Sequence, residues 1–270
     1  MVRLTESFDT GDGLVRWAAL GDGPAVVLTH GTPFSSFVWR DIARALAVSH
    51  RVFVWDLLGY GASDQAEGQD MSIGAQARVL SALLDHWQLN EPALVGHDFG
   101  GAITLRALLI HERRARRLAL VDPVALAPWG TGFFRLAREH TEVFAALPAL
   151  HHEAMLRAHV ATAAATPLRP AVLDALVAPW LGPTGQAAYY RNIAQNHEGF
   201  TDEIEPRYAE VEVPTLVVWG EEDAWIPLAD GQRLHERLPT SQLRTIPGAG
   251  HLVQEDAPAT LAAELARFIA

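Results

Sequence analysis

The sequence of 270 residues contains no cysteine, which excludes a disulfide framework and any metal site built from thiolates. It also lacks a run approaching the roughly eighteen apolar residues that a membrane-spanning helix needs. The first residues, MVRLTES, do not form the apolar centre of an export signal. We therefore expect a protein that neither enters a membrane nor is exported, with the cytoplasm as its default location.

Basic residues are scarce relative to acidic ones. The 21 Lys and Arg against 32 Asp and Glu give a formal net charge of −11, which argues against nucleic acid and anionic membranes as partners. Hydrophobic residues make up 49% of the chain, enough to bury a large core. The length fits one α/β domain with a single insertion.

The segment 95–101 reads VGHDFGG and joins a strand-like run, 93–95, to a helical run, 102–110. Strand, sharp turn and helix are the context of a nucleophile elbow, in which Gly96 and Gly100 permit the tight turn. The central residue is Asp98, and a carboxylate needs no base to activate it for attack on carbon. We therefore predict a covalent alkyl ester, formed at an electrophilic sp³ carbon rather than at an acyl group.

Partners for this nucleophile are expected later in the chain, at the ends of other strands. The apolar run 214–220 ends just before Asp223, which we predict to be the acid of a catalytic triad. Asp122, which follows the strand 118–121, is the alternative acid. The loop 247–251 carries His251, the predicted base.

A third strand, 25–29, runs into the loop His30-Gly31-Thr32-Pro33. A tight loop there can present the backbone N–H of Thr32 beside that of Phe99. Two such donors would stabilise an anion during hydrolysis of the ester. We expect His30 to hold this loop by hydrogen bonding and His97 to be a buried structural histidine.

These elements, in this order and spacing, resemble the α/β-hydrolase family over nearly the whole chain. The H-G-x-P loop and the G-H-D-x-G elbow are similar to those of the branch with aspartate nucleophiles: epoxide hydrolases and haloalkane or haloacid dehalogenases. The resemblance implies a hydrolase without a cofactor or metal. It also implies a small organic substrate, apolar or moderately polar, and a monomer or homodimer.

Strand and helix patterns alternate up to about residue 125 and resume at about residue 213, which predicts a mostly parallel sheet with helices on both faces. The stretch between them has helical patterns and no strand-like run. We predict an α/β-hydrolase core formed by residues 1–127 and 213–270, with a helical cap at 128–212. Such a cap would lie over the carboxyl edge of the sheet, where ligands bind in open α/β folds.

The cap segment 189–192, YYRN, resembles a segment of epoxide hydrolases in which the second aromatic residue is a tyrosine that faces the substrate. That resemblance identifies Tyr190 as the donor that protonates the opening epoxide oxygen. The family usually supplies two such tyrosines, and His151, His152 or His159 could replace the second. The substrate pocket is expected to include His30, Phe34, Trp129, His152, Trp180, Tyr189, Trp225 and Leu252.

Dehalogenation of a haloalkane or haloacid is the alternative activity, because the segment 30–40 is similar to the corresponding loop of haloalkane dehalogenases. Those enzymes hold the halide with an asparagine and a tryptophan at the positions of Thr32 and Phe99, and fluoroacetate-type enzymes carry an arginine at the latter. Trp129 or Trp180 could form a different halide site. A non-hydrolytic biosynthetic enzyme or a small-molecule receptor on the same scaffold is a further alternative, because a fold does not fix an activity.

Overall fold

The structure is a computed structural model that describes residues 2–270. Within that range, eight strands form one sheet in the order β1-β2-β4-β3-β5-β6-β7-β8. The pairs β1–β2 and β2–β4 are antiparallel, and the remaining pairs are parallel. The strands are β1 (Glu6–Asp9), β2 (Leu14–Leu20), β3 (Ala25–Thr29), β4 (Arg51–Trp55), β5 (Ala93–His97), β6 (Arg117–Val121), β7 (Thr215–Gly220) and β8 (Ser241–Ile246).

The central parallel strands are apolar along their whole length because both faces of the sheet are covered. Every residue of β5 (ALVGH) and β7 (TLVVWG) is buried. Such continuous apolar runs are typical of parallel strands that have helices on both sides. The edge strand β8 instead alternates between exposed and half-buried residues over most of its length.

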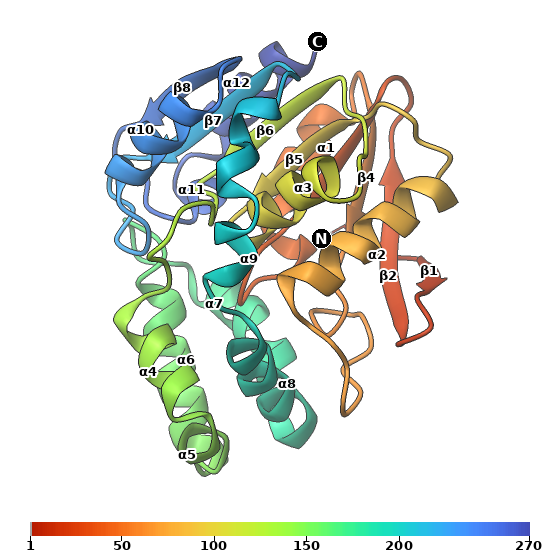
Figure 1. Cartoon of the computed structure of the whole chain (residues 1–270). Coiled ribbons are helices and arrows are strands. Elements are labelled where there is room, and N and C mark those ends of the chain that lie inside the picture. The colour runs from red at the N-terminus through yellow and green to blue at the C-terminus, as the bar shows by residue number, and fades with distance from the viewer. Residues whose placement is uncertain (1) are drawn as a thin grey trace.

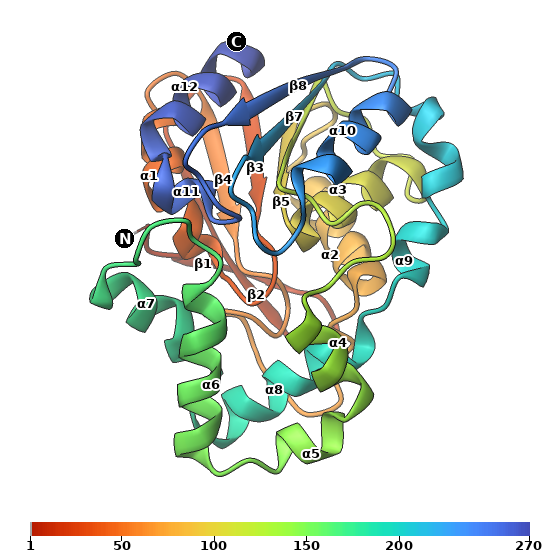
Figure 2. The same cartoon turned by 90° about the vertical axis from the view of Figure 1, so that its left-hand side faces the viewer.

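Figure 2 shows the two helical layers on either side of the sheet, with α1, α11 and α12 on one face and α2, α3 and α10 on the other. The expected α/β fold with a mostly parallel sheet and helices on both faces is confirmed. The bounds are α1 (Arg40–Leu46), α2 (Ile73–His86), α3 (Phe99–Leu109), α10 (Leu228–Arg237), α11 (Val253–Asp256) and α12 (Pro258–Ile269), with a 3₁₀ helix at Ser36–Trp39.

Between β6 and β7 the described chain forms helices and no strand. These are α4 (Gly132–Glu139), α5 (Thr141–Ala145), α6 (Ala149–Ala161), α7 (Pro170–Val177), α8 (Gly182–Gln195) and α9 (Gly199–Asp202), with 3₁₀ helices at Ala178–Trp180 and Glu205–Glu210. Figure 1 shows α4 to α8 gathered beyond one edge of the sheet, below the rest of the molecule. The division into a core and a cap at residues 128 and 212 stays a prediction.

No helix within residues 2–270 combines the length and the apolar character that crossing a membrane requires. The longest apolar helices instead bury one side against the sheet. In α12, for example, Leu261, Leu265 and Ile269 are buried, at the i, i+4 and i+8 positions of one helical face.

Candidate active site

Asp98 occupies the turn between β5 and α3. Its backbone has φ 52° and ψ −122°, a strained conformation for a residue other than glycine. The turn is so tight that a side chain at Gly96 would collide with the backbone of Gly100. The two glycines therefore permit the turn that holds the carboxylate, which is only 4% exposed, at the carboxyl edge of the sheet.

The two oxygens of the Asp98 carboxylate have different surroundings. Oδ1 accepts a hydrogen bond of 2.6 Å from the backbone N–H of Thr32, in the loop after β3. Phe99 begins α3, so its amide N–H has no partner within the helix. Oδ2 lies 3.4 Å from Nε2 of His251. Oδ1 is thus the anchored oxygen, and Oδ2 is the oxygen left for attack.

His251 lies between two carboxylates. Its Nδ1 is 2.9 Å from Oδ2 of Asp223, while its Nε2 faces Asp98. Burial on its own lowers the pKa of His251, but the charges and hydrogen bonds of Asp223 and Asp98 outweigh it and raise that pKa well above its usual value. In the resting site the imidazole is therefore held as a cation.

Asp223 is itself held in place by the loop that follows it. Its Oδ1 accepts hydrogen bonds from the backbone N–H groups of Trp225, at 2.7 Å, and Ile226, at 2.9 Å. With His251 on its other oxygen, the carboxylate has three hydrogen-bond partners that fix its orientation. Asp223, rather than Asp122, is the carboxylate in contact with the histidine.

The alternative acid, Asp122, lies behind Asp223 and is fully buried. Its Oδ1 accepts the backbone N–H of Gly220 at 2.8 Å, and its Oδ2 has no donor among the described residues. Burial and the neighbouring charge of Asp223 raise the pKa of Asp122 well above its usual value. Asp122 therefore keeps its proton to a higher pH than an ordinary carboxyl group does.

Two further buried histidines hold the backbone of the site. Nε2 of His97 lies 2.9 Å from the carbonyl oxygen of His251, and burial together with the charge of His251 lowers the pKa of His97 well below its usual value. Nδ1 of His30 lies 2.9 Å from the Gly31 carbonyl oxygen, and its Nε2 accepts the N–H of Leu57 at 3.0 Å. His30 thus fixes its loop and does not line the pocket, where the sequence placed it.

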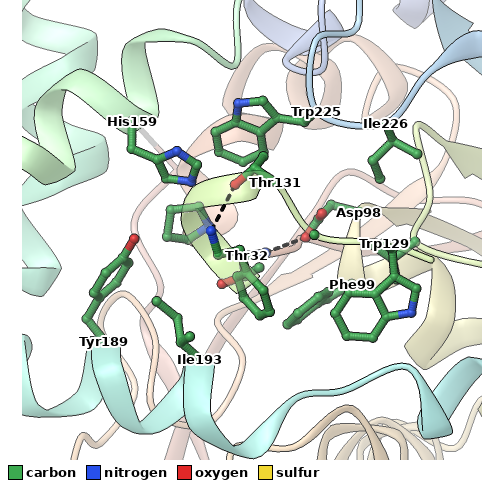
Figure 3. Close-up of a pocket in the computed structure, with 14 residues that line it drawn as sticks. Thr32, Asp98, Phe99, Trp129, Thr131, His159, Tyr189, Ile193, Trp225 and Ile226 are labelled. Atoms are coloured by element: carbon green, nitrogen blue, oxygen red, sulfur yellow. Dashed lines mark hydrogen bonds between the residues drawn. The ribbon is translucent and has the colours of Figure 1, made fainter. Parts of the chain in front are cut away.

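A pocket opens above Asp98, between the sheet edge and the helices that follow β6 (Figure 3). Its cavity has a volume of about 30 Å³, and no Lys or Arg lines it. Phe99 and Trp129 form one wall, with their rings edge to face at 5.5 Å. The lining consists of Thr32, Pro33, Asp98, Phe99, Val124, Trp129, Gly130, Thr131, Phe134, His159, Tyr189, Ile193, Trp225 and Ile226. The pocket suits a small uncharged molecule, because nothing in it pairs with an anionic substrate.

Tyr189, and not Tyr190, lines this pocket, which corrects the position inferred from the sequence motif. Tyr189 and Ile193 lie one turn apart on α8, on the side of the pocket opposite Asp98, and the Tyr189 hydroxyl points toward His159 (Figure 3). The hydroxyl of Tyr190 is instead 3.0 Å from Nδ1 of His152, whose Nε2 lies 2.9 Å from the Trp180 carbonyl oxygen. Tyr190 therefore belongs to a hydrogen-bonded network inside the helical segment.

The Tyr189 hydroxyl has no hydrogen-bond partner among the described residues. Burial and the nearby hydroxyls of Tyr190 and Tyr60 raise the pKa of Tyr189 well above its usual value, so it stays protonated. His159, also in the lining, stacks on Trp225 with ring centroids 4.5 Å apart. Burial and the charge of His251 lower the pKa of His159 to about 4, so it is neutral at pH 7. The pocket therefore offers two neutral polar groups opposite the carboxylate.

The indole N–H groups near the pocket already donate hydrogen bonds to other groups of the protein. That of Trp129 donates to Thr201 Oγ1 at 2.9 Å, and that of Trp225 donates to Thr162 Oγ1 at 2.9 Å. Trp180 lies outside the lining and donates to the Pro33 carbonyl oxygen at 2.6 Å. The indole N–H groups of Trp129 and Trp180, considered for a halide site, are thus both paired within the protein.

Three other expected pocket residues also lie outside the lining. Phe34 stacks behind Trp225 at 5.7 Å, His152 faces Tyr190, and Leu252 is buried with its N–H on the Ala163 carbonyl oxygen. His151 is exposed. Trp129, Tyr189 and Trp225 do line the pocket. The residues that sequence reasoning did not place there are Pro33, Val124, Gly130, Thr131, Phe134, Ile193 and Ile226.

Among residues 2–270, no three His, Asp or Glu side chains converge as metal ligands would. Asp98, His251 and Asp223 instead form one line of contacts, with the imidazole between the two carboxylates. Such an arrangement can alkylate the carboxylate and then hydrolyse the ester.

A family model described as the alpha/beta hydrolase fold matches residues 24–258. Haloalkane dehalogenase 2 of Mycobacterium tuberculosis is 30% identical over 271 residues, which cover 96% of this chain and 92% of that protein. An α/β-hydrolase fold protein from Burkholderia ambifaria has a crystal structure with a TM-score of 0.95 and 47% identity, covering 98% of both chains. The structure of the epoxide hydrolase CorEH has a TM-score of 0.80 at 18% identity, covering 97% of both chains, and shares the fold.

Proposed function

The chain belongs to the α/β-hydrolase family and is a hydrolase, and we propose that it opens epoxides to vicinal diols through an ester on Asp98. The observation that carries this proposal is the polarity of the pocket. A protonated Tyr189 hydroxyl without a protein partner lies in the same pocket as Asp98, whereas the indole N–H groups that a halide would need are occupied.

In the first step, Oδ2 of Asp98 attacks an epoxide carbon and the carbon–oxygen bond of the ring breaks. The leaving oxygen is an alkoxide, which is a poor leaving group unless it receives a proton. Tyr189 is placed to donate that proton, and His159 offers a second neutral hydrogen-bonding group. The Thr32 N–H keeps Oδ1 in place, so that Oδ2 is presented to the substrate.

In the second step, water adds to the carbonyl carbon of the ester. His251 takes the water proton while Asp223 holds the imidazole through Nδ1. Negative charge develops on Oδ1, beside the N–H groups of Thr32 and Phe99. Collapse of this intermediate breaks the ester bond, and the leaving diol oxygen takes the remaining proton of the added water. The Asp98 carboxylate is thereby restored, the diol is released, and His251 keeps the proton that it took from the water.

Dehalogenation is the second candidate, favoured by the 30% identity to haloalkane dehalogenase 2. A halide ion leaves without a proton, but it must be taken from water into an apolar pocket. Moving a halide ion from water into the pocket without N–H donors costs roughly several kcal/mol. The side chain at position 99 is a phenylalanine, which has no donor to offer. The pocket therefore disfavours this reaction.

The purified protein should be incubated with styrene oxide and, separately, with 1-bromobutane, and diol and bromide release should be followed. We expect diol without bromide. Bromide release without diol would select the dehalogenase instead, and release of neither would contradict hydrolysis at this type of carbon.

A single turnover of the epoxide in ¹⁸O-labelled water tests the ester itself. Because the alkyl–oxygen bond made by Asp98 is kept, the first diol should be unlabelled and the label should enter the Asp98 side chain. Label in the diol with none in the protein would show direct attack by water, and Asp98 would then be a base rather than a nucleophile.

A further inference from the structure

Asn192 joins the helix that lines the pocket to the loop that holds Asp98. It lies on α8, between the pocket residues Tyr189 and Ile193, and is fully buried. Its Nδ2 donates a hydrogen bond of 2.8 Å to Thr32 Oγ1. The backbone N–H of that same Thr32 donates to Asp98 Oδ1. A continuous line of hydrogen bonds thus runs from α8 to the nucleophile.

The amide of Asn192 is fixed in one orientation by its other partners. Its Oδ1 accepts hydrogen bonds from the Tyr60 hydroxyl and from Nδ2 of Asn196, the latter at 3.1 Å. The Asn196 Nδ2 also donates to the backbone carbonyl of Asn192 at 2.8 Å. Because two donors occupy Oδ1, the NH₂ group must face Thr32, and the hydroxyl of Thr32 is held from the helical side.

From this geometry we propose that Asn192 is a positioning residue that fixes Thr32 from the helical segment and so aligns the Thr32 N–H with the oxygen that becomes the oxyanion. The inference rests on the proposed ester mechanism. It adds that the position of α8 determines two things together: where Tyr189 lies in the pocket, and how the Thr32 N–H is aligned with the oxyanion.

The two half-reactions should depend on this alignment to different degrees. In the resting enzyme Oδ1 carries half of a carboxylate charge, and that charge decreases as Oδ2 alkylates the substrate. A weaker Thr32 N–H contact therefore does not hinder the first step. In the second step the neutral ester carbonyl gains a full negative charge on Oδ1, and the hydrogen bond from the N–H strengthens on the way to the transition state. Misalignment should therefore slow hydrolysis far more than alkylation.

Other ties between α8 and the core serve as an internal comparison. Gln195, one turn further along the helix, accepts the N–H of Met71 at 2.7 Å and donates to the Gln69 carbonyl oxygen at 3.0 Å. It holds the same helix to the core without touching Thr32. Loss of Gln195 should weaken the packing of α8 and leave the oxyanion contact in place.

The test measures the two rates separately in the full-length protein, with styrene oxide as the probe, by rapid quenching and intact-protein mass. For Asn192→Ala we expect hydrolysis of the ester to fall by roughly 10-fold to 100-fold, part of the effect of losing an oxyanion donor. Alkylation should change by less than about 3-fold, since its barrier does not draw on that contact. The ester should therefore accumulate during turnover.

Thr32→Val removes the same hydrogen bond from the other side and leaves α8 intact, which covers the case in which Asn192→Ala does not fold. It should reproduce the selective loss of hydrolysis, while Thr32→Ser, which keeps the hydroxyl, should hydrolyse the ester faster than Thr32→Val. Gln195→Ala should leave the ratio of the two rates unchanged. These controls separate alignment of Thr32 from general loosening of the helix.

If the Thr32→Val variant folds and hydrolyses the ester at the wild-type rate, the proposal is overturned. Equal slowing of both steps in Asn192→Ala, matched by Gln195→Ala, would do the same, because it would show only a structural role. A wild-type enzyme that turns over without any ester would be a failure of the proposed mechanism instead, and the mass measurement on wild type distinguishes that case.

Discussion

Replacing Tyr189 by phenylalanine removes a hydroxyl from the pocket that contains Asp98 and changes little else in the fold. That hydroxyl has no hydrogen-bond partner among the described residues, and Tyr189 is almost fully buried. Loss of a hydroxyl without a protein partner leaves no donor or acceptor unsatisfied. We therefore expect the free energy of unfolding of Tyr189→Phe to stay within about 1 kcal/mol of the wild-type value.

The effect on the first half-reaction should be large, because the alkoxide then leaves without its donor. A positioned general acid contributes a factor of roughly 10² to 10⁴, which corresponds to about 3 to 5 kcal/mol of barrier. His159 remains beside the gap, so the loss should lie toward the lower end, near roughly 10²-fold. The same substitution should barely affect displacement of bromide, because a halide leaves without a proton.

The assay uses His251→Gln, which lacks the base for hydrolysis and should retain the ester, as the background. The fraction of protein that carries the adduct, measured by mass over time, then gives the alkylation rate with tyrosine and with phenylalanine at position 189. Tyr190→Phe is the matched control. It removes the hydroxyl one residue away, together with its hydrogen bond to His152, so the free energy of unfolding should fall by about 1 kcal/mol. Alkylation should be unchanged.

Unchanged alkylation of Tyr189→Phe by an epoxide would refute its role as the proton donor. A large loss in Tyr190→Phe with a normal Tyr189→Phe would show that the two side chains exchange places when substrate binds. Equal losses with epoxide and bromide would mean that Tyr189 shapes the pocket and does not donate a proton.

Two further substitutions test the carboxyl pair behind His251. Asp223→Asn should reduce ester hydrolysis by roughly 10⁴-fold in single-turnover assays, because the imidazole loses the partner that orients it; a loss below roughly 10-fold would favour Asp122 as the acid. Asp122→Asn keeps an amide that can accept from Gly220 and donate to Asp223, so it should retain activity. The pKa of Asp122 is raised in the folded protein, so above about pH 4 folded wild type holds a proton that the unfolded chain has lost. The free energy of unfolding of wild type should therefore fall as the pH rises above about 4, by at most about 1.4 kcal/mol per pH unit. Asparagine has no such proton, so the stability of Asp122→Asn relative to wild type, measured by urea unfolding, should increase from pH 4 toward pH 8; a constant difference would contradict a protonated Asp122.

The sequence predicts the sheet and the line from Asp98 to Asp223 because these features depend on local patterns. Glycines on both sides of Asp98 indicate the turn, and parallel strands bring their carboxyl ends to one edge of the sheet. Three residues that follow different strands therefore meet without any knowledge of side-chain packing. The choice between Asp122 and Asp223 required the structure, because both follow neighbouring strands and only the distances to His251 separate them.

The pocket lining was less predictable because it depends on how the helices between β6 and β7 rotate. Tyr189 and Tyr190 are about 100° apart around α8, so a small rotation decides which of them faces the substrate. Ile193 supplies a signal in the sequence, because an apolar residue four positions after Tyr189 marks the face that is buried over the site. The tryptophan donors could not be assigned at all, since the partners Thr162 and Thr201 lie far away in the sequence.

The charge around His251 gives the two half-reactions their order. In the resting site Asp98 and Asp223 both raise the pKa of His251, so the imidazole holds a proton and cannot act as a base. Alkylation converts Asp98 into a neutral ester and removes one of those two charges, so the pKa of His251 falls from its value in the resting site. The base is released only after the nucleophile has been used. One proton leaves the imidazole when the ester forms, and one proton is needed in the same step to restore Tyr189, which has given its own to the alkoxide. An epoxide therefore balances the proton count of the site within the first half-reaction, whereas a departing halide leaves that proton to be lost to solvent.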